Sequence, residues 1–209
     1  GFSLGEVVAV TFCGIFDKKT GFDLVCKRGA LMQNEAEKFD TSMAAVVKLT
    51  AEQVEEICEK YSHVFPVNYN CPGQITVSGL SLQMKDIFAD VRAAGGRAIP
   101  LKVKGAFHSP FMNDAAAAFY DELSKAAINK KNIEIYSNIT AEPYTDDVLG
   151  LLSLQICRPV QWEIIIRNMV AGGIDTFIEI GPGKTLTNMI KKIDTEVNAV
   201  SVTEYLSIN

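Results

Sequence analysis

The chain has 209 residues, of which 48% are hydrophobic and 22% are charged, and its formal net charge is −5. The length lies at the upper end of single-domain size, and the apolar content suffices for a buried core. The excess of acidic residues argues against a surface that binds nucleic acid. Charged residues and glycines interrupt every apolar run well before the roughly 18 residues that a membrane span requires, so we expect no transmembrane helix.

The cysteines and histidines argue against disulfides and a zinc site. The five cysteines include no C-x-x-C pair and their number is odd, which suits reduced thiols. The two histidines, His63 and His108, have no recognisable ligand spacing with cysteines, so we expect no bound metal. Reduced cysteines predict a cytoplasmic protein.

The first five residues, Gly-Phe-Ser-Leu-Gly, fit the pattern G-x-S-x-G. This pattern places a serine hydroxyl on a sharp turn between a strand and a helix, so Ser3 is a candidate nucleophile. The alternative is a serine that caps a helix N-terminus. Such a strand-to-helix turn, called a nucleophile elbow, needs a strand before the serine. That strand must come from sequence beyond these residues or from another chain, or else there is no elbow. We expect the chain to be an internal fragment, with a buried helix over residues 6–16.

A second helix is predicted over residues 22–39, and it carries Arg28 among apolar residues. Burying an arginine is costly unless its guanidinium meets an anion. The alternative is an arginine that extends its charged end into solvent. Arg28 is therefore a candidate for binding an acidic substrate.

The pattern then changes to short strands and helices. We predict strands over residues 42–49, 64–70, 74–79 and 97–103, and helices over residues 50–61 and 81–94, the first of which opens on a capping box. This βαββαβ order is typical of a ferredoxin-like domain. We expect residues 41–104 to form such a small domain, inserted into a larger one.

The remaining sequence alternates helices and strands. We predict helices over residues 110–126, 148–156, 162–171 and from about residue 184, and strands over residues 133–138, 176–180 and 197–203. The turn Gly181-Pro182-Gly183 is not a phosphate loop, because Ile178 stands where that motif requires glycine. Residues 1–40 and 105–209 together predict an α/β large domain with a mostly parallel sheet.

His108 lies where the inserted domain is expected to return to the large one. Clefts form at such joints, so His108 is a candidate general base for Ser3. The alternative is a buried histidine whose polar atoms are satisfied by the backbone. His63 is expected at the surface or at a strand edge, without a role. No aspartate is well placed between Ser3 and His108, as the usual Ser-Asp-His order of α/β-hydrolases requires.

Six segments in one order resemble the malonyl-CoA:acyl carrier protein transacylase family, which includes the acyltransferase domains of fatty-acid and polyketide synthases. They are GFSLGE at residues 1–6, KRGALM at 27–32, NYNCPGQ at 68–74, GAFHS at 105–109, PVQW at 159–162 and IEIGPGK at 178–184. The resemblance extends from residue 1 to about residue 193. It implies a hydrolase-like large domain that carries a ferredoxin-like small domain, in agreement with the element pattern.

The resemblance also implies the activity and its residues. Ser3 would be the nucleophile and His108 its base, with the histidine held by the main-chain oxygen of Gln155 in place of an aspartate. A malonyl group would pass from malonyl-CoA through Ser3 to the phosphopantetheine thiol of acyl carrier protein, in fatty-acid biosynthesis and without a permanently bound cofactor. Arg28 would pair with the malonyl carboxylate through a planar, bidentate guanidinium.

Three further residues are implied at the substrate. Met32 would line the site, the backbone N–H of Leu4 would stabilise the oxyanion, and Phe107 would disfavour branched acyl groups. The chain departs from the family in two ways: Phe2 stands where the family usually has histidine, and the upstream Gly-Gln motif that completes the oxyanion hole has no counterpart.

Two other functions remain open from the sequence. A serine esterase or thioesterase would pass the acyl group to water, and a non-catalytic remnant would only bind carrier protein. Because carrier proteins of this kind are usually acidic, a docking surface should be locally basic. The candidate docking residues are the lysine pairs at 130–131 and 191–192.

Overall fold

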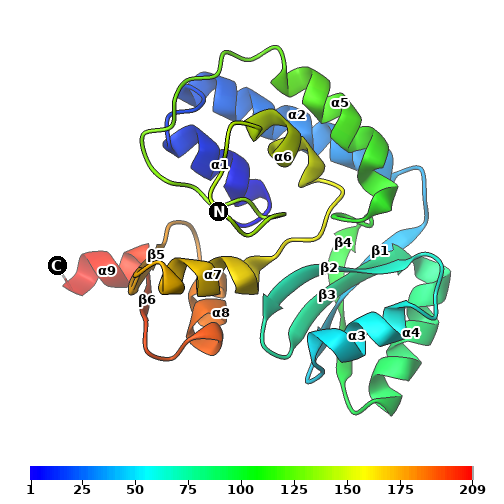
Figure 1. Cartoon of the computed structure of the whole chain (residues 1–209). Coiled ribbons are helices and arrows are strands. Elements are labelled where there is room, and N and C mark those ends of the chain that lie inside the picture. The colour runs from blue at the N-terminus through cyan, green and yellow to red at the C-terminus, as the bar shows by residue number, and fades with distance from the viewer. Residues whose placement is uncertain (209) are drawn as a thin grey trace.

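The computed structural model describes residues 1–208 (Figure 1). Its helices are α1 (Leu4–Phe12), α2 (Lys18–Ala36), α3 (Ala51–Cys58), α4 (Ser81–Ala93), α5 (Asn113–Leu123), α6 (Val148–Leu154), α7 (Trp162–Ala171), α8 (Thr185–Ile193) and α9 (Val202–Ile208), with a short 3₁₀ helix η1 (Pro110–Met112). Its strands are β1 (Thr41–Val47), β2 (Val64–Cys71), β3 (Gln74–Leu80), β4 (Arg97–Lys104), β5 (Thr176–Glu179) and β6 (Asn198–Ser201). No helix in this part of the chain is long and apolar enough to span a bilayer.

A four-stranded antiparallel sheet forms the middle of the chain. Its strand order is β2-β3-β1-β4, and the predicted sequence of elements, βαββαβ, is present. Alternate residues of β1 and β3 enter one core together with apolar residues of α3 and α4, among them Ala44, Val46, Val77, Val54 and Ile87. Since side chains alternate between the two faces of a strand, residues such as Met43 lie on the opposite face of the sheet, where they line a cavity.

Helices α1, α2, α5 and α6 gather around a second core above the sheet (Figure 1). Fully buried residues such as Val10, Phe119 and Leu152 lie at its centre. The first helix is shorter than predicted, since α1 ends at Phe12 and is followed by Gly14 with a φ of 86°. Glycine adopts this left-handed conformation without a steric penalty, which ends the helix.

The C-terminal part consists of β5 and β6, which pair in parallel, and of α7, α8 and α9 (Figure 1). It is attached to the large sheet by hydrogen bonds between β2 and Val160: Tyr69 N donates to Val160 O, and Val160 N donates to Val67 O, each at 2.9 Å. Trp162 and Ile165 of α7 lie in the core of this part.

The mixed α/β class is confirmed, but the sheets differ from expectation. The larger sheet is antiparallel, and parallel pairing within residues 1–208 is confined to β5 and β6 apart from an isolated bridge between Asn68 and Val160. The strand predicted over residues 133–138 is wrong, because only Tyr136 forms a bridge, with Pro143. The backbone N–H of Asn138 is used by a buried carboxylate instead of a neighbouring strand.

The last strand ends earlier than predicted, and a helix follows it. β6 stops at Ser201, and α9 begins at Val202. Ser201 and Glu204 form a reciprocal pair, in which Glu204 N donates to Ser201 Oγ at 3.3 Å and Ser201 N donates to Glu204 Oε2 at 3.0 Å. This capping box, S-x-x-E, was visible in the sequence and outweighs the β-branched residues that favoured a longer strand.

Candidate active site

Ser3 occupies a strained turn at the start of α1. Its backbone has φ 50° and ψ −109°, an uncommon conformation for a residue with a side chain, and such strain concentrates at functional sites. The turn is also too tight for a side chain at Gly1, because a Cβ there would lie 1.9 Å from the carbonyl oxygen of Gly5. The sequence G-x-S-x-G therefore forms a sharp turn that presents the serine.

The hydroxyl of Ser3 does not cap α1. It makes no cap hydrogen bond, and Oγ lies 2.8 Å from Nε2 of His108. The alternative of a helix-capping serine is thus wrong. Two residues that are 105 positions apart in the chain are brought to hydrogen-bond distance.

His108 is oriented by the backbone. Its Nδ1 lies 2.7 Å from the carbonyl oxygen of Gln155, which only accepts, so Nδ1 carries the proton and Nε2 is left to accept from Ser3. The imidazole is buried, and burial together with the positive charge of Arg28 lowers its pKa to about 4. At neutral pH the histidine is therefore uncharged and can act as a base.

The side chain of Gln155 connects the serine, the arginine and a buried carboxylate. Its Oε1 accepts from Nη2 of Arg28 at 2.7 Å. Its Nε2 donates to the carbonyl oxygen of Ser3 at 2.6 Å and to Oε2 of Glu6 at 2.7 Å. Since Gln155 is fully buried, these bonds fix the amide in one orientation.

Glu6 is a site residue that the sequence analysis missed. Its carboxylate is fully buried and accepts three hydrogen bonds: from the Tyr144 hydroxyl at 2.6 Å, from Asn138 N at 2.8 Å and from Gln155. Burial raises its pKa, and these hydrogen bonds oppose the rise. The available signal was an acidic residue inside an otherwise apolar helix, the same argument that selected Arg28.

Asn138 is a second site residue that the sequence did not single out. Its side chain is fully buried and holds both sides of the serine turn: Oδ1 accepts from Ser3 N at 2.7 Å, and Nδ2 donates to the carbonyl oxygen of Gly1 at 2.8 Å. The distorted backbone of Ser3 is therefore supported by a residue that lies 135 positions further along the chain.

A cavity of about 370 Å³ opens in front of the serine. It is lined by Phe2, Ser3, Arg28, Gly29, Met32, Gln33, Met43, Asn68, Leu101, Val103, Phe107 and His108. The structure thus brings together five predicted site residues, Ser3, Arg28, Met32, Phe107 and His108. Leu4 is not among the lining residues and is 47% exposed, but its N–H belongs to the first turn of α1, where amides have no acceptor within the helix.

Arg28 is buried and only partly satisfied. Nη2 donates to Ser3 Oγ at 3.1 Å as well as to Gln155, whereas Nε is buried without a partner among residues 1–208. Burial lowers the pKa of the guanidinium to about 10, and the charge of Glu6 opposes this. Arg28 therefore remains a cation at neutral pH, and the alternative of a solvent-extended arginine is wrong.

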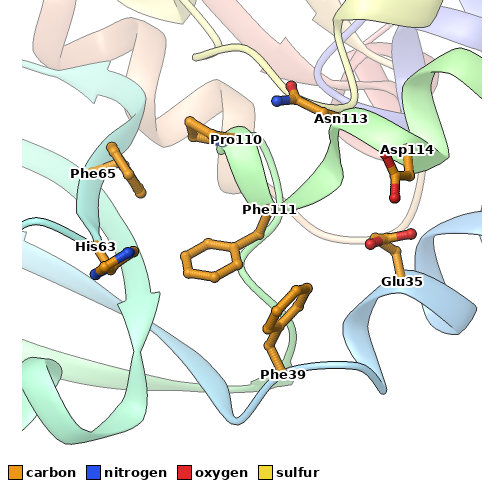
Figure 2. A pocket seen from close by; sticks show the side chains of 8 residues that line it. All are labelled: Glu35, Phe39, His63, Phe65, Pro110, Phe111, Asn113 and Asp114. Atoms are coloured by element: carbon orange, nitrogen blue, oxygen red, sulfur yellow. The ribbon is translucent and has the colours of Figure 1, made fainter.

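His63 lies in a different hollow, away from Ser3. Figure 2 shows this hollow, of about 310 Å³, with the ring of Phe111 at its centre. Phe39 packs edge-on against Phe111 with ring centroids 5.2 Å apart, and the rings of His63 and Phe65 lie 6.2 and 6.3 Å from it. His63 is exposed, as the sequence predicted, and contacts neither Ser3 nor His108.

Comparison with known proteins decides the family. The pattern described as the acyl transferase domain matches residues 1–207. The chain belongs to the acyl transferase family. It is 34% identical over 212 residues to the malonyl CoA-acyl carrier protein transacylase of Bacillus subtilis, covering 98% of this chain and 67% of that protein. It is 33% identical to the enzyme of the same name from Escherichia coli K12, covering 98% and 68%.

Solved structures superpose on all or nearly all of this acyl transferase. The malonyl CoA-acyl carrier protein transacylase of Clostridium perfringens superposes with a TM-score of 0.95 at 40% identity, covering 100% of this chain and 69% of that one. A malonyl-transacylase in complex with a type II polyketide acyl-carrier protein gives a TM-score of 0.90 at 28% identity, covering 96% and 66%.

Phe2, which departs from the family pattern, has a packing role in this acyl transferase. It lines the cavity, and its ring packs edge-on against Trp162 with centroids 5.5 Å apart. The aromatic pair connects the serine turn to α7.

Proposed function

We propose that this acyl transferase moves a malonyl group from malonyl-CoA to the phosphopantetheine thiol of an acyl carrier protein, through an ester on Ser3, in fatty-acid biosynthesis. One observation carries the proposal: Ser3 Oγ lies between a neutral histidine nitrogen at 2.8 Å and a buried guanidinium nitrogen at 3.1 Å. A base activates the hydroxyl, and a cation beside it selects an acyl group that ends in a carboxylate. Two relatives are named malonyl CoA-acyl carrier protein transacylase, and malonyl is an acyl group that ends in a carboxylate.

In the first step, His108 Nε2 takes the proton of Ser3 while Oγ attacks the thioester carbon of malonyl-CoA. The tetrahedral intermediate collapses, the carbon–sulfur bond breaks, and the coenzyme A thiolate leaves with the proton from His108. The malonyl group is then an ester of Ser3. The Gln155 carbonyl oxygen stabilises the imidazolium that forms, because it accepts a hydrogen bond from Nδ1–H.

In the second step, the thiol of the carrier protein replaces coenzyme A. His108 takes the thiol proton, the sulfur attacks the ester carbon, and the carbon–oxygen bond to Ser3 breaks as Oγ regains the proton. Both steps pass through an oxyanion, for which the N–H of Leu4 is the proposed donor. An oxyanion-hole donor typically contributes roughly 10²–10³ in rate.

Arg28 supplies the specificity for a free carboxylate. Its unpartnered Nε and its cavity position leave donors available for a planar, bidentate pair. A neutral acyl group would leave these buried donors unpaired, which costs binding energy. Met32 and Phe107 line the same cavity, and the ring of Phe107 is proposed to exclude branched acyl groups.

We further propose the domain arrangement that the resemblance implies. Residues 41–104 form a ferredoxin-like small domain, and residues 1–40 and 105–209 belong to a hydrolase-like large domain. The strand order β2-β3-β1-β4 supports the first assignment. The cavity fits an arrangement of two domains, because Met43 and Leu101 contribute to it from one and Ser3 from the other. Five free thiols suit a cytoplasmic protein.

Intact mass spectrometry tests the proposal. Incubation with malonyl-CoA should add one malonyl unit to the protein, and a Ser3→Ala variant should remain unmodified. Adding holo carrier protein should then move the malonyl group onto the carrier thiol. Release of free malonate at the same rate with and without carrier would identify an esterase instead, and an unmodified wild-type protein would identify a non-catalytic carrier-binding protein.

A further inference from the structure

β4 is an edge strand with an exposed apolar stripe. It lies at the end of the order β2-β3-β1-β4, so β1 is its partner strand and its other side is unpaired within residues 1–208. Three residues of alternating position, Ile99, Leu101 and Val103, are 39%, 38% and 43% exposed. β4 therefore presents exposed apolar surface along its length.

A bulge directs part of this stripe toward the nucleophile. Along β1 and β4, Ala44 is opposite Pro100 and Ser42 is opposite Lys104, so β4 has two extra residues between these pairs. Bulges bend a strand and re-aim its side chains, and they are common beside active sites. Leu101 and Val103 lie in this bulge and line the cavity of Ser3.

The same strand carries three unpaired cations. Arg97, Lys102 and Lys104 are exposed, and the structure of residues 1–208 gives none of them an ion pair or a side-chain hydrogen bond. Lys104 shares a neighbouring hollow with Glu37 and Asp40. By contrast, Lys131 of the sequence-predicted docking pair already binds Glu134 and the carbonyl oxygen of Tyr144.

We propose that β4 is the docking strip for the carrier protein. On the proposed function, the carrier must deliver a thiol to Ser3 on an arm that enters the cavity. The cations of β4 meet an acidic face of the carrier, and its apolar stripe contacts the arm. From Val103 to Arg97 the strand extends roughly 20 Å at about 3.3 Å per residue, so the charges begin at the cavity and continue outward. In a chain of net charge −5, this local positive surface steers an acidic partner to the site.

The alternative explanation for the charged residues of β4 is that they protect the edge of the sheet. Lysine and proline on an edge strand prevent pairing with other chains, and β4 carries both. That explanation accounts for Lys102 and Pro100, but it does not require apolar residues of the same strand to line the nucleophile cavity. The two explanations differ in what charge reversal does to transfer.

The test separates docking from chemistry. The variant Arg97→Glu/Lys102→Glu/Lys104→Glu is compared with a matched control, Lys191→Glu/Lys192→Glu, which changes the other sequence-predicted pair on α8. Loading of Ser3 is measured with malonyl-N-acetylcysteamine, a thioester without phosphates or carrier. Transfer from loaded enzyme to holo carrier protein is measured at low and at high salt.

The β4 variant should load within about twofold of wild type and transfer at least tenfold more slowly at low salt, because long-range charge raises association rates by orders of magnitude. At about 0.5 M salt, screening should reduce the difference in transfer rate between wild type and the β4 variant. Wild-type transfer by the β4 variant, or an equal loss in the control, would overturn the proposal. If wild type fails to load, the proposed function fails, and titration of labelled carrier against wild type and both variants still decides whether β4 binds it.

Discussion

The carbonyl oxygen of Gln155 lies 2.7 Å from Nδ1 of His108, so the residue that orients the imidazole does so with its backbone. The side chain of the same residue independently holds the arginine and the buried carboxylate. Mutation can therefore separate the two contributions, because a change of side chain leaves the carbonyl in place.

Gln155→Ala should preserve the base and weaken the substrate site. The His108 bond remains, while Arg28 loses its 2.7 Å partner. Hydrogen bonds to charged groups contribute about 1.5–3 kcal/mol, so kcat/KM for malonyl-CoA should fall roughly 10- to 100-fold, mainly through KM. Steady-state kinetics with malonyl and acetyl thioesters measure this. A uniform loss of kcat for both substrates would show that the side chain also positions His108.

Arg28→Ala should shift the acyl preference from malonyl toward acetyl. The carboxylate loses its buried cation, whereas an acetyl group no longer faces unpaired donors. Competition between malonyl-CoA and acetyl-CoA, read as the ratio of the two adducts on Ser3, measures the change. Arg28→Lys serves as the control, because it keeps the charge but loses the planar fork. An unchanged ratio in the alanine variant would contradict the assigned role.

The same arginine should control the acid limit of the reaction. His108 accepts a proton only while it is neutral, so acylation should persist below pH 6 and fail as the pH approaches its pKa of about 4. Burial lowers that pKa most, and the charge of Arg28 is the second cause. Arg28→Ala should therefore raise the pKa of His108 and move the acid limb of the pH–rate profile to higher pH. Arg28→Lys should leave the limb nearly in place. Single-turnover acylation by acetyl-N-acetylcysteamine follows the limb without a carboxylate that needs Arg28, and coincident limbs in wild type and Arg28→Ala would refute the coupling.

The sequence predicted the order of most elements, and the residues that it selected around Ser3 lie together in the structure. Periodicity placed α7 and the βαββαβ segment almost residue by residue, because each element there has its own clear apolar pattern. The G-x-S-x-G pattern selected Ser3, the joint between the expected domains selected His108, and the apolar surroundings in its helix selected Arg28. The family resemblance selected Gln155. In the structure these four residues contact one another.

The supporting residues were not predictable in the same way. Asn138 and Tyr144 act through hydrogen bonds to Ser3 and Glu6 across more than 130 positions of chain, and no local pattern marks such contacts. The strand predicted at 133–138 failed for the same reason: its apolar pattern was correct, but its backbone partner is a carboxylate of α1.

Glu6→Gln should destabilise the fold without removing any reactive group. The carboxylate accepts from three donors, and an amide would turn one acceptor into a donor that faces another donor. An unsatisfied buried group costs about 1–3 kcal/mol, which chemical denaturation would measure as a lower midpoint with an unchanged slope. Glu52→Gln is the matched control, since Glu52 occupies the first turn of α3 and is exposed. Equal stability of the two variants would mean that Glu6 is already protonated and donates.

Phe111→Ala should loosen the joint next to His108. Phe111 lies in η1, three residues after His108, and its ring contacts Phe39, Phe65 and His63 (Figure 2). Phe to Ala costs 3–5 kcal/mol in a full core, and since this ring is half-buried we expect about 2 kcal/mol by denaturation. Phe111→Leu keeps apolar volume and should recover most of the loss. η1 fixes the backbone that follows His108, so the alanine variant should also lower kcat more than it raises KM. A loss of stability with an unaltered kcat would show that the aromatic cluster serves the fold alone.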